Sequence, residues 1–70
     1  MKTYYVIQVI GYGTKQRFCI KEVVKEDKQL GSTTLLVTNG RSYRSESGAR
    51  RAAEEMGIEI ALVGDLYQII

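Results

Sequence analysis

Residues 39–57 read Asn-Gly-Arg-Ser-Tyr-Arg-Ser-Glu-Ser-Gly-Ala-Arg-Arg-Ala-Ala-Glu-Glu-Met-Gly, and this stretch decides the fold. It contains a hairpin signal, a helix start, one amphipathic helix and a helix end, in that order. The pair Asn39-Gly40 predicts a type I′ hairpin turn, because both central residues of that turn need a positive φ. Residues 41–44 should therefore fold back as a short strand that carries Tyr43.

A single amphipathic helix follows the predicted hairpin. Ser45 is a suitable N-cap, since its hydroxyl can accept a backbone N–H of the first turn, and Gly57 is suited to the position just past the helix. Spacing of i, i+3, i+4 and i+7 predicts an apolar face that packs on a sheet, formed by Ala49, Ala52, Ala53 and Met56. On the outer face, i, i+4 spacing predicts the ion pairs Arg50–Glu54 and Arg51–Glu55.

Strand patterns lie on both sides of this stretch. The segment 3–10 is apolar on both of its alternating faces, which is typical of a central strand covered on both sides. A polar turn is expected at 25–32, and the apolar end of the chain, 66–70, reads as a further strand-like segment. The remaining predicted strands are 17–24, 33–38 and 58–63.

These patterns predict an α+β fold in one domain over residues 1–70. We expect a small antiparallel sheet of four to five strands with one helix packed on one face, in the order β-β-β-short β-α-β. The periodicity leaves open which face of the sheet meets the helix.

Composition excludes several classes of function. Cys19 is the only cysteine, so an intramolecular disulfide is impossible and a reducing, cytoplasmic setting is expected. The chain has no histidine, the commonest metal ligand and general base. Gly11-Tyr12-Gly13 lacks the later glycine and the lysine of a phosphate loop. We therefore expect no catalytic, cofactor or metal site, and no membrane span, since no apolar run approaches about 20 residues.

A protein interface is the first functional prediction. One helix can cover only one face of the sheet, and an uncovered apolar face usually marks an interface. Five tyrosines add to this, because tyrosine is favoured at interfaces. The chain is thus expected to be a non-catalytic binding module for a protein partner or a second copy, of the accessory or inhibitory kind that phages and mobile elements encode. The candidate interface residues are Tyr4, Val6, Ile10, Leu36 and Tyr67.

A nucleic-acid-binding domain is the alternative prediction. Residues 39–51 carry four arginines against a single acid, Glu46, and arginine binds phosphate through a planar fork of donors. A tyrosine among them could stack on a base. Lys15, Arg17 and Lys21 on the second strand could extend the patch. The candidate contacts are Arg41, Tyr43, Arg44, Arg50 and Arg51.

Residues 33–56 also resemble the AP2-like N-terminal DNA-binding domains of tyrosine integrases. The resemblance consists of three strands followed by a helix after a Tyr-x-Ser/Thr-x-x-x-Ala run, here Tyr43, Ser45 and Ala49. It implies a sheet face laid into the major groove of DNA. The long apolar first strand and the strand after the helix depart from that pattern, and neither functional prediction rests on it.

Overall fold

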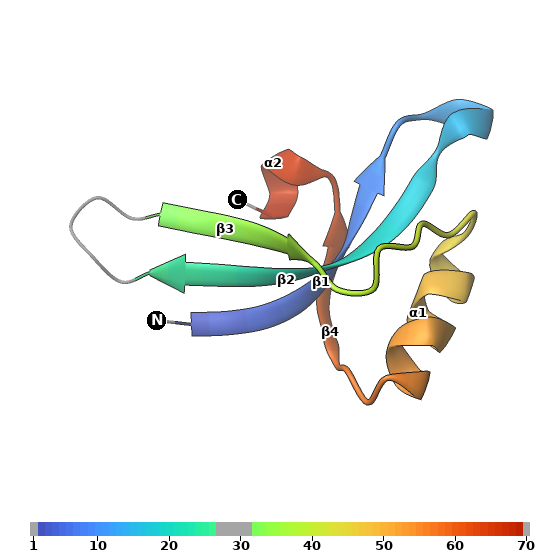
Figure 1. The fold of residues 1–70 in the computed structure, drawn as a ribbon. Helices are drawn as coiled ribbons and strands as arrows, with labels where there is room; N and C mark the ends of the chain where they lie inside the picture. The colour runs from blue at the N-terminus through green and yellow to red at the C-terminus, as the bar shows by residue number, and fades with distance from the viewer. Residues whose placement is uncertain (1, 27–31, 70) are drawn as a thin grey trace.

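The computed structural model describes residues 2–26 and 32–69. A four-stranded sheet in the order β3-β2-β1-β4 forms the body of the molecule (Figure 1). β2 pairs antiparallel with β1 and with β3, whereas β4 runs parallel to β1. The elements are β1 (Lys2–Ile10), the 3₁₀ turn η1 (Gly13–Lys15), β2 (Arg17–Glu26), β3 (Ser32–Val37), α1 (Glu46–Glu55), β4 (Ile60–Gly64) and α2 (Leu66–Ile69).

The α+β class is confirmed, and the sheet proves to be mixed rather than wholly antiparallel. The parallel pair follows from the connection: α1 carries the chain back across the sheet, so β4 starts at the same end as β1. β1 is a central strand, as its two apolar faces predicted. The centre of the predicted turn at 25–32 lies outside the described residues, while β2 extends to Glu26 and β3 begins at Ser32.

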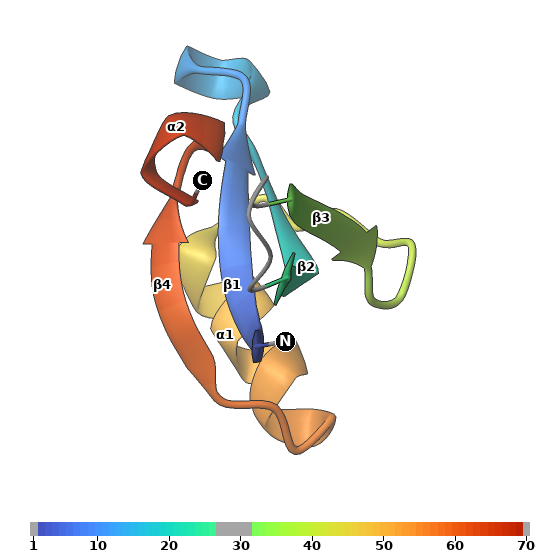
Figure 2. The ribbon, with the colours of Figure 1, turned by 90° about the vertical axis from the view of Figure 1, so that its left-hand side faces the viewer.

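The two faces of the sheet are assigned by the strand registers. Ile7 of β1 lies opposite Ile20 of β2, and both pack against Ala49 and Ala53 of α1. We call this side the α1 face. Val6 and Val23 point to the other side, where Ile69 of α2 covers them. We call that side the α2 face. Figure 2 shows α1 behind the sheet and α2 in front of it, beside β1.

The helix α1 forms where the sequence predicted it. The Ser45 hydroxyl accepts a hydrogen bond from Gly48 N at 3.1 Å, and Gly57 follows the helix with φ of +73°. Gly57 N donates to Glu54 O at 3.0 Å and Ile58 N to Ala53 O at 2.9 Å, the two bonds of a Schellman motif. This motif turns the chain toward β4.

Two details of the α1 prediction differ from the structure. Arg50 pairs with Glu46, one turn earlier than predicted, with Nε and Oε2 2.8 Å apart. Glu46 lies in the first turn of the helix, where its charge also suits the helix dipole. Met56, at the end of the predicted apolar face, is 39% exposed, because it is the C-cap and lies past the edge of the sheet contact.

The predicted hairpin at Asn39-Gly40 is wrong. Gly40 has φ of +70°, but no non-glycine residue in the described chain has a positive φ, so Asn39 does not adopt the type I′ geometry. Asn39 instead accepts from Arg41 N at 3.1 Å and donates to the Tyr43 hydroxyl at 2.8 Å. The chain then continues along β2, where Tyr43 forms an isolated bridge to Phe18. Burial of the Tyr43 ring under α1 prevails over the local turn signal.

The predicted strand-like end of the chain is a short helix. Asp65 and Gln68 form a capping box around its first turn: Gln68 N donates to Asp65 Oδ1, and Asp65 N donates to Gln68 Oε1, each at 3.0 Å. The turn brings Ile69 over Val6 and Val23, leaving Ile69 only 2% exposed. A helix forms here because it covers apolar surface that an extended tail would leave open.

Candidate functional site

The five predicted interface residues do not form one surface. Tyr4, Val6 and Ile10 share the α2 face, but Val6 is fully buried beneath Ile69. Leu36 lies opposite Glu22, which pairs with Tyr5, so it belongs to the α1 face. It is 47% exposed there. The expectation of a wholly uncovered second face failed because the sequence reasoning missed α2.

The signal for α2 was present in the sequence. Asp65-x-x-Gln68 has the spacing of a capping box. Since the helix is only four residues long, it covers the centre of its face and leaves apolar side chains exposed around it. The large apolar side chains of β1, β4 and α2 that are at least one third exposed are Ile10, Leu62, Leu66 and Tyr67, and Tyr67 is 88% exposed.

β4 is an edge strand with no neighbour on its outer side within residues 2–26 and 32–69. Its sequence, Ile-Ala-Leu-Val-Gly, contains no charged residue and no proline, the two devices that usually protect a sheet edge. Its register shifts between Tyr5 and Val6, which is the only irregularity in its pairing with β1. Backbone N–H and C=O groups on the outer side of β4 are therefore free to pair with another extended chain.

A groove runs between α1 and the start of β4, with a volume of about 500 Å³. Its floor is apolar, and its rim carries two carboxylates and one arginine. We call it the β4 groove, and its lining residues are Arg50, Ala53, Glu54, Ile58, Glu59 and Ile60. A second hollow of about 360 Å³ shares Ile58 and Glu59 and extends along the other side of the strand toward Tyr4 and Tyr5.

The charge around β4 is negative. Glu59 immediately precedes the strand and Asp65 immediately follows it, and both are exposed. Glu54 lies on the groove rim, whereas the Arg50 guanidinium there is already bonded to Glu46. A chain that paired with β4 would therefore meet acidic side chains at both ends of the strand.

The predicted arginine patch is also divided by the fold. Arg41, Arg44 and Arg51 are exposed. Arg50 forms the only ion pair among the residues that the structure describes. Tyr43 is half-buried against the core beneath α1, and its hydroxyl accepts a hydrogen bond from Asn39, so the ring is committed to the fold rather than held out as a free stacking platform.

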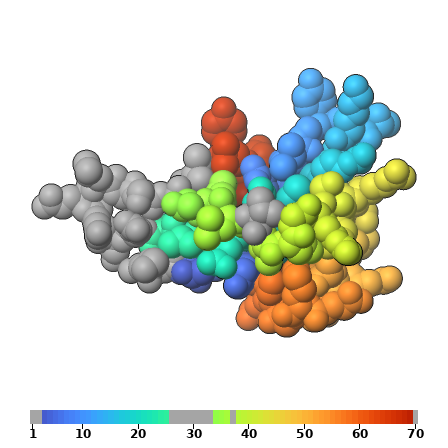
Figure 3. Space-filling model, in the orientation of Figure 1, coloured from blue at the N-terminus to red at the C-terminus, as the bar shows by residue number. Residues whose placement is uncertain are grey.

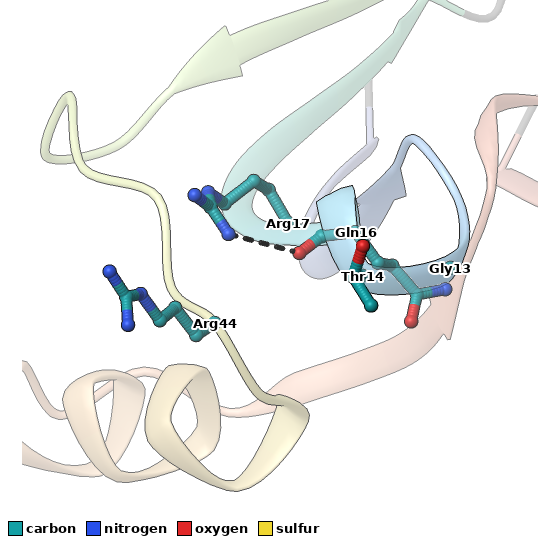
Figure 4. A pocket seen from close by; sticks show the side chains of 5 residues that line it. All are labelled: Gly13, Thr14, Gln16, Arg17 and Arg44. Carbon is teal, nitrogen blue, oxygen red and sulfur yellow. Dashed lines mark hydrogen bonds between the residues drawn. The ribbon is translucent and has the colours of Figure 1, made fainter.

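The fold instead brings Arg44 beside Arg17. Both line a hollow of about 390 Å³ between η1 and the segment before α1, together with Gly13, Thr14 and Gln16 (Figure 4). In Figure 3 the η1 loop and the start of α1 project on the same side of the molecule. The sequence raised Arg17 as a possible extension of the arginine patch, but it gave no register that singles out Arg44 as its neighbour, because the Phe18–Tyr43 bridge joins segments 25 positions apart.

Tyr5 and Glu22 form a polar pair on the α1 face. They lie opposite each other across β1 and β2. The Glu22 charge raises the pKa of Tyr5 above its ordinary value, and the hydrogen bond to Glu22 and partial burial add to the effect. Both residues are half-buried on the sheet.

The remaining candidates show no chemistry. Cys19 is half-buried on the α2 face, opposite Gln8. Among the described residues, no three histidine, cysteine or carboxylate side chains come together as a metal site. Neither of the two α-helices in that part of the chain is long and apolar enough to cross a bilayer.

No protein family, curated protein or solved structure matches this chain. The resemblance to integrase domains implied a sheet face laid into a DNA groove, and in this chain the face opposite α1 carries α2 at its centre.

Proposed function

We propose that this protein is a non-catalytic binding module that captures an extended segment of another protein by adding it as a strand to β4. The observation that carries the proposal is the combination of an apolar, uncharged edge strand with the β4 groove beside it. Strand addition uses main-chain hydrogen bonds for affinity and side-chain pockets for specificity. Here the groove would receive every second side chain of the added strand.

The charge around β4 favours a partner segment in which apolar residues alternate with lysine or arginine. Basic side chains would face Glu54 and Glu59 on the rim and Asp65 past the strand. Complementary charge mainly favours fast association and the correct register.

A second copy of the chain fits β4 less well. In an antiparallel, two-fold pairing centred on Leu62, Glu59 of one copy would lie opposite Asp65 of the other at both ends. Like charges placed opposite each other in a sheet are destabilising. We therefore take a different protein as the partner, and a cytoplasmic location as part of the proposal, since the lone cysteine suits a reducing compartment.

Nucleic-acid binding stays the second candidate function. Exposed Arg41, Arg44 and Arg51 support it, although Arg50 is paired and Tyr43 is half-buried against the core. The two candidates differ in their response to salt, because contacts with backbone phosphates make affinity fall steeply as salt rises.

Selection from a library of random extended peptides tests the strand-addition proposal. We expect the selected sequences to alternate apolar and basic residues, and binding to perturb the amide resonances of residues 60–64. Leu62→Lys should weaken binding by roughly tenfold or more, because a lysine on an edge strand opposes further pairing.

Leu36→Lys is the matched control, since Leu36 is a similarly exposed leucine near the opposite edge of the sheet. It should leave peptide affinity unchanged. Selection of acidic peptides, or equal losses in the two leucine variants, would count against β4 as the binding edge.

A further inference from the structure

Arg17 and Arg44 each lie next to a residue of the Phe18–Tyr43 bridge, and both line one hollow. Phe18 N donates to Tyr43 O and Tyr43 N donates to Phe18 O, each at 2.8 Å. Arg17 precedes Phe18 and Arg44 follows Tyr43, so in this antiparallel bridge both arginines lie at the same end. The pairing is therefore fixed by two short backbone hydrogen bonds and by the burial of both aromatic rings against the α1 core.

Two like charges at facing positions cost stability unless something lies between them. Facing side chains of the same charge in an antiparallel pair are destabilising. Among the described residues that line this hollow, none is acidic, and the Arg50–Glu46 pair lies elsewhere on α1. An anion in the hollow would remove this repulsion.

The two guanidinium groups have donors to spare. Arg17 Nη1 donates to the carbonyl of Gln16 at 3.4 Å, a long bond to a neighbouring residue, which leaves four of about five N–H groups of that side chain. Figure 4 shows both arginine side chains extending toward the same side, from the start of β2 and from the segment before α1. Thr14 and Gln16 also line the hollow, although the Gln16 side-chain amide extends away from the two arginines in Figure 4.

From these observations we propose that Arg17 and Arg44 bind a phosphomonoester dianion. Each planar fork can bond two oxygens, and a terminal phosphate offers three. Its charge of about −1.5 to −2 at pH 7 matches two arginines better than a carboxylate or a backbone phosphodiester, which each carry one charge. Because the hollow is larger than one phosphoryl group and its wall is polar, the source can be free phosphate or a polar phosphorylated small molecule.

This site is separate from the β4 groove. Arg44 lies before the start of α1, whereas the groove is lined by residues near the end of that helix. Loss of one function should therefore leave the other intact, so failure of either proposal can be recognised independently.

Titration of the full chain, followed by amide and arginine Nε–H resonances, tests the phosphate site. The probes are inorganic phosphate, glucose 6-phosphate and a short single-stranded oligonucleotide without terminal phosphates, all at constant ionic strength. We expect saturable shifts at residues 13–17 and 44 with the first two probes, and stronger binding as pH rises through about 6, where the dianion forms. Tighter binding of glucose 6-phosphate than of phosphate would identify a small-molecule source; equal affinities would identify free phosphate.

Arg17→Gln and Arg44→Gln should each weaken phosphate binding by about tenfold, since each removes a charge-assisted pair of hydrogen bonds. Arg51→Gln is the matched control: it removes an exposed arginine outside the hollow and should change nothing. All three positions are exposed, so unchanged resonances elsewhere will show that the variants fold.

Three results would overturn the proposal. Shifts that chloride reproduces at the same ionic strength would show that there is no site. Equal weakening by Arg51→Gln would show a diffuse charge effect. Tighter binding of the oligonucleotide, with the same dependence on Arg17 and Arg44, would replace the phosphomonoester by a nucleic-acid backbone.

Discussion

The two faces of the sheet are covered by very different means. On the α1 face, a ten-residue helix contributes Ala49 and Ala53 to a core with Ile7 and Ile20, and six partly buried apolar residues surround it. On the α2 face, a four-residue helix contributes one residue, Ile69. Val6 and Ile7 are adjacent in β1 and are fully buried on opposite faces of the sheet. The burial of Val6 therefore depends on the Ile69 side chain and on the capping box that holds α2 in place.

This difference explains where surface is left for function. α1 covers the β1 and β2 part of its face, where it buries Ile7 and Ile20, and the β4 groove lies at the margin of this cover. α2 covers only the centre of the other face and leaves Leu62 and Tyr67 exposed beside the β4 edge. β4 is both an open edge strand and next to the part of the α2 face that α2 leaves uncovered. We place partner binding at β4 for this reason.

Ala53→Glu should give the largest effect. The change buries a carboxylate against Ile7 and Ile20 without a partner, and Ala53 is only 1% exposed. An unpaired buried charge costs several kcal/mol, of the order of the whole stability of a small domain, about 5 kcal/mol. We expect an unfolded chain by circular dichroism, while Arg51→Glu on the exposed side of the same helix stays folded. A folded Ala53→Glu variant would remove α1 from the core.

Ile20→Ala and Ile69→Ala compare the two covers directly. Truncation of a buried isoleucine costs about 2–5 kcal/mol. Ile20 lies in the centre of the sheet and should be near the top of that range. Ile69 lies at the end of a short helix that can relax, so the stability lost in Ile69→Ala should be near the lower end of that range. Equal free energies of unfolding in urea would show that the two faces are equally important.

Gln68→Ala should cost about 1 kcal/mol, as loss of a cap usually does. Gly64→Ala should act on the same turn, because its added Cβ would collide with the Gln68 side chain. Both changes should loosen α2 and raise hydrogen exchange at residues 66–69, with β2 and α1 unaffected. Gly13→Ala is a suitable comparison, because an added Cβ there would contact no other atom, although Gly13 also has a positive φ. The change should lower the stability of the fold without loosening α2.

The Tyr5–Glu22 pair should give the smallest effect, visible mainly in alkaline titration. The raised pKa means that the folded state favours neutral Tyr5, so this contribution is present below the ordinary tyrosine pKa and is lost as pH rises through the folded value. Glu22→Gln should lower the Tyr5 pKa, because it removes the largest cause. The ring carbon resonance of Tyr5 reports this directly, and an unchanged pKa would show that Glu22 does not act on it.

The sequence predicted those parts of the fold that local rules govern. Ser45, Gly57 and the alanine face of α1 act within one helix, so spacing alone identified them. It failed at Asn39-Gly40, where the burial of Tyr43, a long-range effect, prevailed. The site was predicted less well. Val6 was expected on an open face, but Ile69 of α2 covers it. Arg17 was named as a possible part of the arginine patch, but only the structure shows that it shares one hollow with Arg44 and not with Arg50 or Arg51.

The most direct test of strand addition is to measure intermolecular nuclear Overhauser effects between a selected peptide and the labelled protein. Our account predicts contacts from the peptide Hα and HN protons to the amides of Ile60–Gly64, in a continuous ladder, together with contacts from alternate peptide side chains to Ile58 and Ala53 in the β4 groove. A tightly bound peptide whose contacts lie instead on β3, or on the exposed side of α1, would contradict it.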